Sequence, residues 1–599
     1  MSAFAAVITV DGPPLAPAVL ARLRAELARA PHDDLNAVTV APRDSDAPRG
    51  GVAMVHALMT TREGARCGPH RSARGVLLTG NVRVDAQREL REALRVAGVR
   101  PPAIGDDEGL LLAAWEAWGE EMLTRVLGDY AFVLWDPGAG RGLVARDALG
   151  IRPVYWASIR GGIVVSSSID AVRAHPDVSD GLDDAWIAST LAVGYATDVT
   201  RTVFADVHRL ASGSSIALGG PSIRRRVWWQ PPSPAPSRRS DREVIAEFHA
   251  VLGDAVADRM RLPEVVIPLS GGLDSPSLTA TARRVRPGVD VTSVTIAGPD
   301  AMDDPEPPLA RRVAQRLGTR HVVTTFGYSG MRVDEIPRER LPEPTNSVSN
   351  GREMRIVAAM AAHGRVQLNG EDGDGLLLPS SFAEERRRFG TVRTIARLAR
   401  FAVQSGRKPH TGLRLREWWS APDVEPSAPA WLAAPWRDAA ARAIPQPCHD
   451  MTALVRPDTV ARVTHPFFQM VTQPDFGVLG ALRHEVAWPL MDLRLLGLVM
   501  SLPTTPWLQR KELLRRAFRG TLPDEVLRRP KTPVRTPSSS IVATWRAEQG
   551  AHPPTVSDRV SRWVDPAQVN TALAGTATDA IDHAWRVLAL DNWLRAGIP

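Results

Sequence analysis

The sequence predicts two folded units, an N-terminal α+β unit rich in sheet and a C-terminal α/β unit with a doubly wound parallel sheet. The chain has 599 residues, which exceeds the roughly 100 to 200 residues of a typical domain. In the first part, short apolar runs of strand length are broken by Gly, Asp and Pro. After residue 240, such runs alternate with helices of about 10 to 15 residues, a rhythm typical of parallel sheets.

The N-terminal unit is assigned to residues 1–215. Its predicted strands carry the runs AAVITV, GVLLTG, DYAFVLWD, GLVARD and GIVVSSS, with one amphipathic helix, DEGLLLAAWEAWGEEMLTRVLG, among them. Residues 216–240 are assigned to a linker, because the run QPPSPAPSRRS combines Pro, Ser and Arg with nothing to bury.

The second unit is assigned to residues 241–599. It opens with a helix, REVIAEFHAVLGDAVADRM, followed by the strand EVVIPLS, the helix SPSLTATARRV and the strand DVTSVTIAG. Residues 380–450 are helical, rich in Arg and less regular, which indicates an insertion or a lid. A helical pair that includes the run DAIDHAWRVLALDNWLRAGI ends the chain.

Composition excludes several classes of protein. The chain is 44% hydrophobic and 23% charged, values typical of a globular protein, and no run approaches the roughly 18 to 20 apolar residues of a membrane-spanning helix. Cys67 and Cys448 lie too far apart in sequence for a disulfide framework, so we expect a reduced, cytoplasmic protein. Lys plus Arg exceeds Asp plus Glu by 73 to 66, and basic residues scattered without aromatic neighbours do not predict nucleic-acid binding.

Lysine is almost absent from this chain. Of the 73 basic residues, the only lysines are Lys408, Lys511 and Lys531. A codon bias towards Arg explains the general replacement, but a compact ammonium cannot always be replaced by a planar guanidinium. The remaining lysines are therefore candidates for chemistry that requires one.

The most specific motif is EVVIPLSGGLDSPSL, residues 264–278. A buried strand runs into Ser270, Gly271 and Gly272, whose small side chains allow backbone N–H groups to approach an anion, and the helix that begins near Ser275 directs its positive end to the same place. Asp274 beside that anion is favourable if it binds Mg²⁺. The GxxxxGK[ST] spacing of a Walker loop is absent. The motif therefore predicts a pyrophosphate-binding loop, although a glycine-rich turn of purely structural origin is the alternative.

This loop resembles the SGGLDS signature of the ATP pyrophosphatases of the asparagine synthetase group, which cleave ATP to AMP and pyrophosphate while adenylating a carboxylate. Further resemblances follow in the family's order: DPEPPLARRVAQRLGTRH at 304–321, LNGEDGDG at 368–375, EVAWPLMDLRLLGLVMSLP at 485–503 and KELLRRAFRGTLPDEVLRRPKTP at 511–533. Upstream, GDYAFVLWD and ARDALGIRPVYW resemble the family's N-terminal glutaminase-like domain. The resemblance covers nearly the whole chain and implies an N-terminal sheet sandwich of the Ntn type.

The resemblance assigns roles to acidic residues. Asp274 and Asp374 would both bind Mg²⁺, together with phosphate oxygens of ATP. Glu371 matches a base that removes a proton from the attacking amine in some family members. The family often has Asp-Glu where this chain has Asp374 followed by Gly375, so one supporting carboxylate is missing. A solvated acidic loop is the structural alternative for Glu371 and Asp374.

The resemblance also assigns roles to the lysines and to the nucleotide pocket. Lys511 and Lys531 fall in the C-terminal segment where the family carries lysines that neutralise pyrophosphate and the charge that develops during acyl transfer. The residues implied in binding ATP and pyrophosphate are Leu269, Ser270, Gly271, Gly272, Asp274, Ser275, Ile296 and Gly370. Of these, Leu269, Ile296 and Gly370 would line the adenine and ribose pocket, and their small or apolar character is equally expected in a core.

The N-terminal unit departs from a glutaminase. The amidotransferases of this family need a thiol at the mature N-terminus, and position 2 here is Ser2. The family's glutamine-contacting Asn-Gly-Glu appears as Thr79, Gly80 and Asn81, although Asp107 keeps the position of a family acid. A serine-based glutaminase is one interpretation, and a structural remnant is the interpretation that these changes favour.

Family branches that lack the thiol use an amine on the substrate itself and close a ring. β-Lactam synthetases do so on a small amino acid and pair a Tyr with a Glu, the Tyr standing where this chain has Glu371. The segments VHALMTTREGAR and LLTGNVRVDAQREL resemble lasso peptide cyclases instead. This resemblance implies a macrolactam synthetase that uses ATP and Mg²⁺ on a precursor peptide, with a leader peptidase and a leader-recognition protein as further partners and neither nucleic acid nor membrane.

Two alternatives stay open at this stage. One is an amide ligase of the β-lactam synthetase type, or an ammonia-dependent ligase of the asparagine synthetase type. The other is a catalytically silent scaffold that binds a precursor peptide or a peptidase, an interpretation that the intact SGGLDS motif, Asp374 and Lys531 disfavour.

Overall fold

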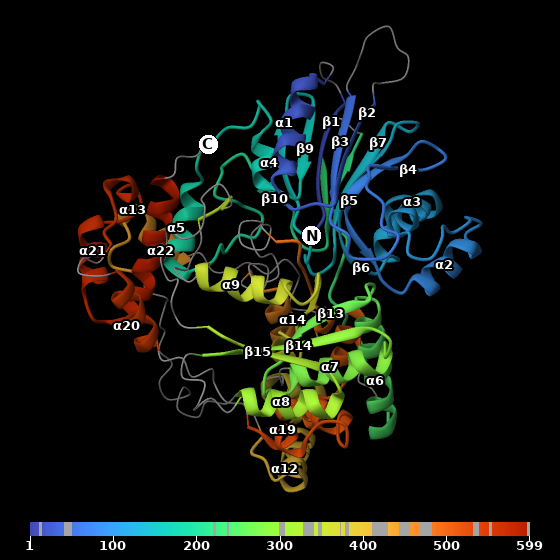
Figure 1. The fold of residues 1–599 in the computed structure, drawn as a ribbon, viewed down its shortest axis with the longest axis vertical. Helices are drawn as coiled ribbons and strands as arrows, with labels where there is room; N and C mark the ends of the chain where they lie inside the picture. The colour runs from blue at the N-terminus through green and yellow to red at the C-terminus, as the bar shows by residue number, and fades with distance from the viewer. Residues whose placement is uncertain are drawn as a thin grey trace.

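The computed structural model contains three sheets in the part of the chain that it describes (Figure 1). The described residues are 1–10, 15–40, 51–219, 223–235, 239–298, 306–326, 341–344, 350–371, 373–377, 382–409, 429–442, 454, 456–466, 482–530, 538–549 and 554–595. None of the helices in these ranges is both long enough and apolar enough to cross a membrane.

Two antiparallel six-stranded sheets form the N-terminal unit. The first has the strand order β10-β8-β9-β1-β3-β2 and the second β12-β11-β7-β6-β5-β4. The strands of the first sheet are β1 (Ala3–Thr9), β2 (Asp34–Val40), β3 (Gly51–Leu58), β8 (Tyr155–Ile159), β9 (Gly162–Ser166) and β10 (His208–Arg209). Those of the second are β4 (His70–Arg71), β5 (Leu77–Val84), β6 (Gly128–Asp136), β7 (Arg141–Arg146), β11 (Ser214–Leu218) and β12 (Arg224–Val227).

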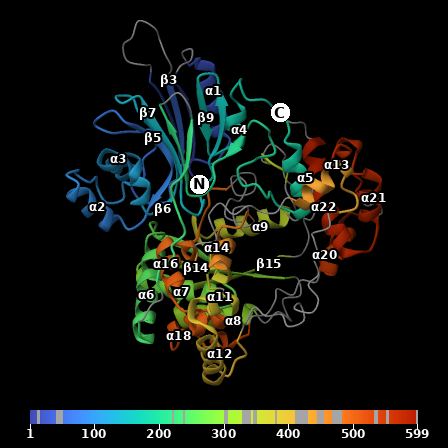
Figure 2. The same cartoon turned by 180° about the vertical axis from the view of Figure 1, so that it is seen from behind.

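Both faces of the central strands are covered, which explains their continuous apolar sequences. In β1, Phe4 and Ile8 point into the core between the two sheets, whereas Ala5 and Val7 point to the opposite face. That outer face is covered by α1 (Pro17–Ala28) and α4 (Ile169–Arg173). Helices α2 (Gln87–Val96) and α3 (Asp107–Trp118) cover the outer face of the second sheet. The predicted sheet sandwich is confirmed as four layers, helix, sheet, sheet and helix (Figures 1 and 2).

The predicted parallel sheet of the second unit is also confirmed. Its strand order is β15-β14-β13-β16-β17, and every pairing is parallel. The strands are β13 (Glu264–Pro268), β14 (Asp290–Ala297), β15 (Arg320–Thr325), β16 (Val366–Leu368) and β17 (Glu485–Ala487). The chain moves outward from β13 to β15 and then returns to the other side of β13. The switch point between β13 and β16 is where open parallel sheets bind ligands.

Helices cover both faces of this sheet. Val266 of β13 packs with Met360 of α9 (Asn350–Ala361) on one face. Val265 and Ile267 point to the other face, in a core shared with α6 (Asp241–Ala257), α7 (Asp274–Val285) and α8 (Glu306–Leu317). Successive side chains of β13 therefore point to opposite faces of the sheet, and each face is covered by helices, which is the doubly wound arrangement.

Part of the segment that the sequence assigns to the linker, residues 216–240, forms strands. Strands β11 and β12 pair with each other and β11 pairs with β7, so the second sheet continues to Val227. Ile216 and Leu218 alternate along β11 and both enter the core of the sandwich. Trp229 is then buried against the core of the second unit. The connection between the units is therefore shorter than 216–240, and it is packed.

The C-terminal helices join the core of the N-terminal unit, although the sequence places them with residues 241–599. Helices α20 (Ser538–Gln549), α21 (Pro566–Ala574) and α22 (Thr578–Arg595) stand beside α5 (Asp184–Val193) in Figure 1. Trp545, Trp563 and Trp585 share one hydrophobic cluster with Trp186 of α5. The chain thus returns to its first unit after completing the parallel sheet.

The predicted insertion, residues 380–450, is helical where it is described. It contains α11 (Phe382–Phe389), α12 (Thr391–Ser405) and α13 (Ala434–Arg442). Residues 410–428 and 443–450 of this segment lie outside the described residues.

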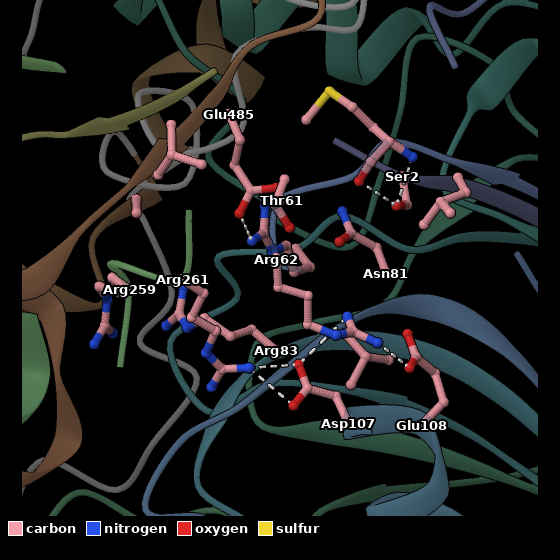
Figure 3. Close-up of a pocket in the computed structure, with 16 residues that line it drawn as sticks. Ser2, Thr61, Arg62, Asn81, Arg83, Asp107, Glu108, Arg259, Arg261 and Glu485 are labelled. Atoms are coloured by element: carbon pink, nitrogen blue, oxygen red, sulfur yellow. Dashed lines mark hydrogen bonds and ion pairs between the residues drawn. The ribbon is translucent and has the colours of Figure 1, made fainter. Parts of the chain in front are cut away.

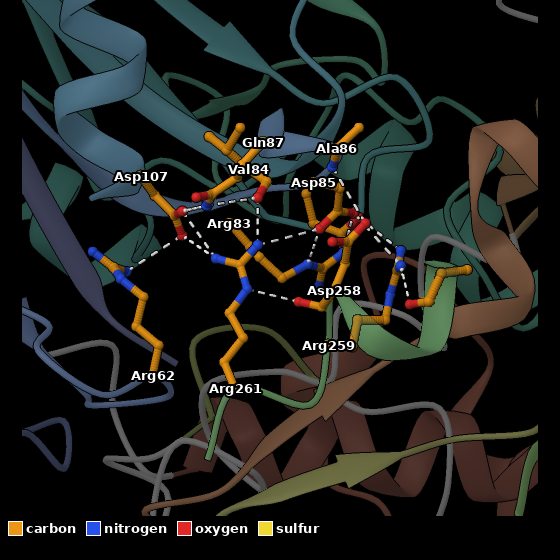
Figure 4. Close-up of polar contacts among 12 residues, drawn as sticks. Arg62, Arg83, Val84, Asp85, Ala86, Gln87, Asp107, Asp258, Arg259 and Arg261 are labelled. Atoms are coloured by element: carbon orange, nitrogen blue, oxygen red, sulfur yellow. Dashed lines mark hydrogen bonds and ion pairs between the residues drawn. The ribbon is translucent and has the colours of Figure 1, made fainter. Parts of the chain in front are cut away.

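A buried network of charges joins the two units (Figure 4). Arg259, whose side chain is 1% exposed, follows α6 and lies 3.0 Å from Asp492, with 3.5 Å to Asp85 and 3.6 Å to Asp129 on the N-terminal unit. Arg261 reaches across to Asp107 at 2.7 Å. Each buried arginine is therefore matched by carboxylates from the other unit, an arrangement that fixes their relative orientation.

We expect Arg259→Leu to lower the free energy of unfolding by about 3–5 kcal/mol, because the change removes a buried cation that Asp85, Asp129 and Asp492 share. Urea denaturation followed by tryptophan fluorescence measures this. The matched control is Arg88→Leu, which removes an exposed arginine paired with Glu89 and should leave the midpoint unchanged. Equal midpoints for the two variants would show that the network contributes nothing to stability.

Candidate adenylation site

The predicted phosphate loop follows β13 at the carboxyl edge of the sheet. The Ser270 amide donates to Oγ of Ser275 at 2.9 Å, the Gly272 amide donates to Oγ of Ser270 at 3.2 Å, and the two hydroxyls lie 3.1 Å apart. These bonds close the loop over the first turn of α7, which begins at Asp274. The loop therefore places small residues and a positive helix end at one point, as an anion requires.

The loop after β16 lies directly against the phosphate loop. A Cβ on Gly370 would be 3.1 Å from the backbone N and Cα of Ser275, so only glycine permits this approach without a shift. Asn369 fixes the loop, because its amide donates to the carbonyl of Ala487 at 2.9 Å and its side-chain oxygen accepts from the Glu371 amide at 3.0 Å. Parallel pairing of β13 with β16 thus brings two distant motifs together.

Of the two acidic residues predicted to bind Mg²⁺, Asp274 is the one whose side chain the structure describes. Asp274 begins α7, and Gly373 begins α10 (Gly373–Leu376), where a Cβ would lie 2.6 Å from Oδ1 of Asp274. Asp374 follows Gly373 in the chain; its side chain lies outside the described part, as does the whole of Lys531.

Lys511 reaches the same place from the C-terminal segment. Its Nζ forms an ion pair with Oδ2 of Asp274. The residue precedes α18 (Glu512–Ala517) and adopts a left-handed backbone with φ of 57°, as does Arg510 with φ of 53°. Such conformations cost non-glycine residues roughly 1–2 kcal/mol each. The chain therefore maintains an unfavourable turn at the position that carries this ammonium.

The three residues predicted to line the nucleotide pocket lie at the carboxyl ends of neighbouring strands. Leu269 is buried, its amide donates to the carbonyl of Val294 at 2.8 Å, and its carbonyl accepts from Oγ1 of Thr295 at 2.7 Å. Ile296 is half-buried near the end of β14, and Gly370 follows β16. The fold brings these positions to one edge, on either side of the phosphate loop.

Glu371 is exposed on the loop after β16. Protein atoms nevertheless crowd its carboxyl group, and the resulting desolvation raises its pKa, an effect that the Asn369 side chain partly opposes. A carboxylate with a raised pKa is a stronger base. This property suits the proton-accepting role that the family resemblance implies.

The residues present fit Mg²⁺ bound together with ATP. Oxygen ligands from Asp274 are of the type that Mg²⁺ prefers, and Gly271 and Gly370 let the Arg529 guanidinium and the backbone of Ser275 approach the loop closely. Within the described ranges no three His, Cys, Asp or Glu side chains cluster as a metal cage. A metal held by one or two carboxylates therefore depends on phosphate oxygens to complete its coordination, as is usual for Mg²⁺ in nucleotide sites.

The pocket beside Ser2 is lined by charged and polar side chains (Figure 3). The Ser2 hydroxyl accepts from the Met59 amide at 3.0 Å and donates to the Met59 carbonyl at 3.3 Å. The adjoining cavity measures about 20 Å³, enough for about one water molecule. Asp107, which keeps the position of a family acid, is already bound by Arg62 at 3.5 Å and Arg261 at 2.7 Å. Arg62 also pairs with Glu108, and Arg152 pairs with Glu485, so further charged residues that line this pocket bind one another.

Arg515 and Arg529 lie close together in the sequence and could contact phosphate, although a structural or solvated role is the more frequent one for an arginine. Arg515 is buried on α18, and the Arg529 guanidinium lies so close to Gly271 that a Cβ there would collide with it. In the sequence, the one feature that could indicate a functional role for Arg529 is its position two residues before Lys531. Among 70 arginines that signal does not separate a functional residue from a solvated one.

Comparison with known proteins agrees with this geometry. The asparagine synthase family model matches residues 247–595, and the glutamine amidotransferase domain model matches residues 67–229. The chain therefore belongs to the asparagine synthase family. It is an ATP-dependent, amide-forming ligase, and ATP with Mg²⁺ is the cofactor set of this family.

Individual relatives cover different shares of the chain. A putative glutamine-hydrolysing asparagine synthetase of Mycobacterium bovis is 26% identical over 568 residues, 88% of this chain and 85% of the relative. Asparagine synthetase 3 of Bacillus subtilis is 26% identical over 196 residues, 32% of this chain and 31% of the relative. Carboxyethyl-arginine beta-lactam-synthase of Streptomyces clavuligerus is 30% identical over 233 residues, 38% of this chain and 41% of the relative.

We expect Asp274→Asn to weaken binding of ATP in the presence of Mg²⁺ by at least about 10-fold, because a metal ligand is lost. Isothermal titration with and without EDTA measures this; in EDTA, where Asp274 has no metal to bind and repels the phosphates, the variant should bind ATP at least as tightly as wild type. Asp290→Asn, at the exposed start of β14, is the control. If Asp274 did not bind Mg²⁺ it would repel the phosphates in either buffer, so tighter ATP binding by Asp274→Asn in the presence of Mg²⁺ would contradict the assignment.

Proposed function

We propose that this ligase is a lasso peptide cyclase, which joins the N-terminal amine of a precursor peptide to an internal Asp or Glu side chain. The observation that carries this proposal is a contrast between the two sites. The adenylation site keeps its phosphate loop, Asp274 and Lys511, whereas the pocket beside Ser2 has no thiol and space for about one water molecule. This contrast supports a nitrogen nucleophile that comes from the substrate or from solution.

The reaction has two steps. A carboxylate oxygen of the peptide attacks the α-phosphorus of ATP, and the bond to the β-phosphate oxygen breaks, giving an acyl-adenylate and pyrophosphate. The peptide amine then attacks the acyl carbon, its proton passes to a base, and AMP leaves with the former carboxylate oxygen. Bound Mg²⁺ supplies charge neutralisation for the phosphate oxygens in the first step.

The protein's own residues divide these tasks. The amides and hydroxyls of the phosphate loop and the start of α7 bind the phosphate chain, and the ammonium of Lys511 offsets negative charge beside Asp274. Lys531 has the same role in this proposal. Glu371 accepts the amine proton in the second step, a role that its raised pKa favours.

Ring closure explains why a substrate amine can replace ammonia. When the amine and the adenylated carboxyl belong to one bound peptide, the second step is effectively unimolecular. The similarity to carboxyethyl-arginine beta-lactam-synthase supports a ring-closing reaction in general. Glu371 stands where the β-lactam enzymes have Tyr, which favours a peptide substrate. In this proposal the enzyme is cytoplasmic and works with a leader peptidase and a leader-recognition protein.

The proposal predicts that the purified chain, supplied with ATP, Mg²⁺ and a linear core peptide, converts the peptide to a product lighter by one water, with AMP formed in equal amount. Mass spectrometry of product and chromatography of nucleotides measure this. An N-acetylated peptide should be adenylated but not cyclised. Amide formation from free aspartate and ammonium, or ring closure of a small β-amino acid with no reaction of peptides, would favour the alternative ligases.

In the same assay, Glu371→Gln separates the two steps. Loss of a general base typically slows a step by about 10²- to 10⁴-fold, so ring closure should slow while ATP–pyrophosphate exchange continues. Glu264→Gln, at the exposed start of β13, is the matched control. Equal loss of exchange and closure in Glu371→Gln would assign this residue to adenylation instead.

A further inference from the structure

The unfavourable turn at Arg510 and Lys511 is held by one buried guanidinium. Nε of Arg515 donates to the carbonyl of Arg510 at 2.8 Å, so it binds the turn directly. Nη2 of Arg515 donates to the carbonyl of Arg529 at 3.0 Å, and Nη1 donates to the carbonyl of Leu527. Arg515 therefore ties the segment that carries Lys511 to the segment that leads to Lys531.

The Arg529 side chain extends from this second segment to the phosphate loop. It is 16% exposed, and its Nη1 lies 3.6 Å from Oε1 of Glu306. That nitrogen is buried, and no hydrogen-bond partner for it exists among the described residues. It lies directly against Gly271, where a side chain would displace it. A guanidinium nitrogen thus faces a loop whose geometry binds an anion.

We propose that Arg529 binds the β- and γ-phosphates of ATP and the pyrophosphate product, and that Arg515 positions both Arg529 and Lys511. A planar guanidinium can bind two phosphate oxygens at once. The inference rests on the family's ATP chemistry and is independent of which carboxylate is adenylated.

This assignment predicts that Arg529→Gln weakens binding of Mg²⁺-pyrophosphate and Mg²⁺-ATP by about 10- to 100-fold, the effect of losing charge-assisted hydrogen bonds. Binding of AMP, which lacks both phosphates, should stay within about twofold of wild type on the same grounds. Isothermal titration of the full-length chain measures all three ligands. Arg528→Gln, the exposed neighbour paired with Asp524, is the matched control.

Arg515→Lys tests the positioning role, because one ammonium cannot reproduce three bonds spread over two segments. It should weaken pyrophosphate binding and spare AMP binding, whereas Arg519→Lys, on an exposed neighbour, should change neither. Unchanged pyrophosphate binding in Arg529→Gln, or equal weakening of AMP and pyrophosphate, would overturn the inference alone. A wild-type protein that binds neither ATP nor pyrophosphate would overturn the proposed function as well.

A second, independent observation concerns helix α12 and the segment around it. Residues 386–409 contain eight basic residues and no Asp or Glu, which exceeds the net charge of +7 for the whole chain. The basic residues are Arg386, Arg387, Arg388, Arg393, Arg397, Arg400, Arg407 and Lys408. The positive excess is therefore concentrated on one segment, whereas the sequence analysis expected it to be scattered.

Helix α12 has apolar side chains on two opposite faces. Thr394 and Phe401 are buried against the protein. On the other face, Val392 is 81% exposed, Ile395 53% and Val403 84%. At about 100° per residue these positions lie on the side opposite Phe401. A surface helix normally has a single apolar stripe, and Figures 1 and 2 place α12 at the end of the molecule far from the N-terminal sheets.

We propose that the outer face of α12 binds an acidic amphipathic helix of a partner protein. Arg393 and Arg400 lie together along one side of the apolar stripe and would pair with carboxylates. The stripe consists of Val, Ile and Ala and lacks the Trp, Phe and Leu typical of helices that insert into lipid. A second copy of the chain would bring like charges together. Beyond the end of α12, the same basic segment contacts the turn that carries Lys511, because Arg510 donates to the carbonyl of Lys408 at 3.3 Å.

The probe for this proposal is a synthetic helix of about three heptads with Leu and Ala on one face and Glu on both flanks. Fluorescence anisotropy should show binding that weakens at least about 10-fold in the triple variant Val392→Gln, Ile395→Gln, Val403→Gln, because buried apolar area is lost. Val96→Gln with Ile104→Gln, exposed elsewhere, is the control and should bind as wild type.

Three results would overturn the docking proposal. The first is equal binding of a proline-containing peptide of the same charge, which would indicate charge attraction alone. The second is stronger binding to vesicles that contain phosphatidylglycerol, with loss of that binding in the triple variant. The third is a concentration-dependent dimer in sedimentation that the triple variant abolishes.

Discussion

The close approach of two loops at the switch point of the parallel sheet is the constraint on which the site depends. Parallel pairing of β13 with β16 brings the loop after β16 to the phosphate loop, and Gly370 permits contact with the backbone of Ser275. Three of the proposed site residues lie close to that contact. Glu371 follows the glycine by one residue, Asp274 precedes Ser275, and Lys511 reaches Asp274 from the C-terminal segment.

The N-terminal unit supports this edge without sharing its chemistry. Its sandwich fold is intact, but Arg62, Asp107 and Arg261 occupy the space beside Ser2 with ion pairs. Arg259 continues the network into the second unit, and the C-terminal tryptophans pack back onto the first. Burying so many charges is costly unless each is paired. Beside Ser2 this condition is met, because Asp107 pairs with both Arg62 and Arg261.

Much of the fold could be predicted because its signals are local. Apolar runs bounded by turn residues indicated the strands, and SGGLDS indicated a strand, a loop and a helix in one place. The strands β11 and β12 were assigned to a linker because the proline-rich run beyond them dominated that stretch. The packing of Trp545 and Trp585 on α5 joins positions hundreds of residues apart, and no local pattern reports it.

The contrast between local sequence signals and long-range contacts also applies to the site residues. Lys511 was recognisable because lysine is rare in this chain, whereas Arg515 and Arg529 are two of 70 arginines and have no distinctive spacing. Their importance rests on three carbonyl contacts and on proximity to Gly271, which are properties of the folded chain alone.

The different roles of the Lys511 ammonium and the Arg515 guanidinium follow from the shapes of the two groups. At position 511 the chain must bring a single positive charge to one carboxylate oxygen of Asp274 from a tight left-handed turn, a task that suits a compact ammonium. At position 515 it must bind three carbonyls that lie in different directions, and only a planar group with several donors can do so. A codon bias towards arginine is therefore compatible with the function of position 515, whereas the chemistry at position 511 requires a lysine.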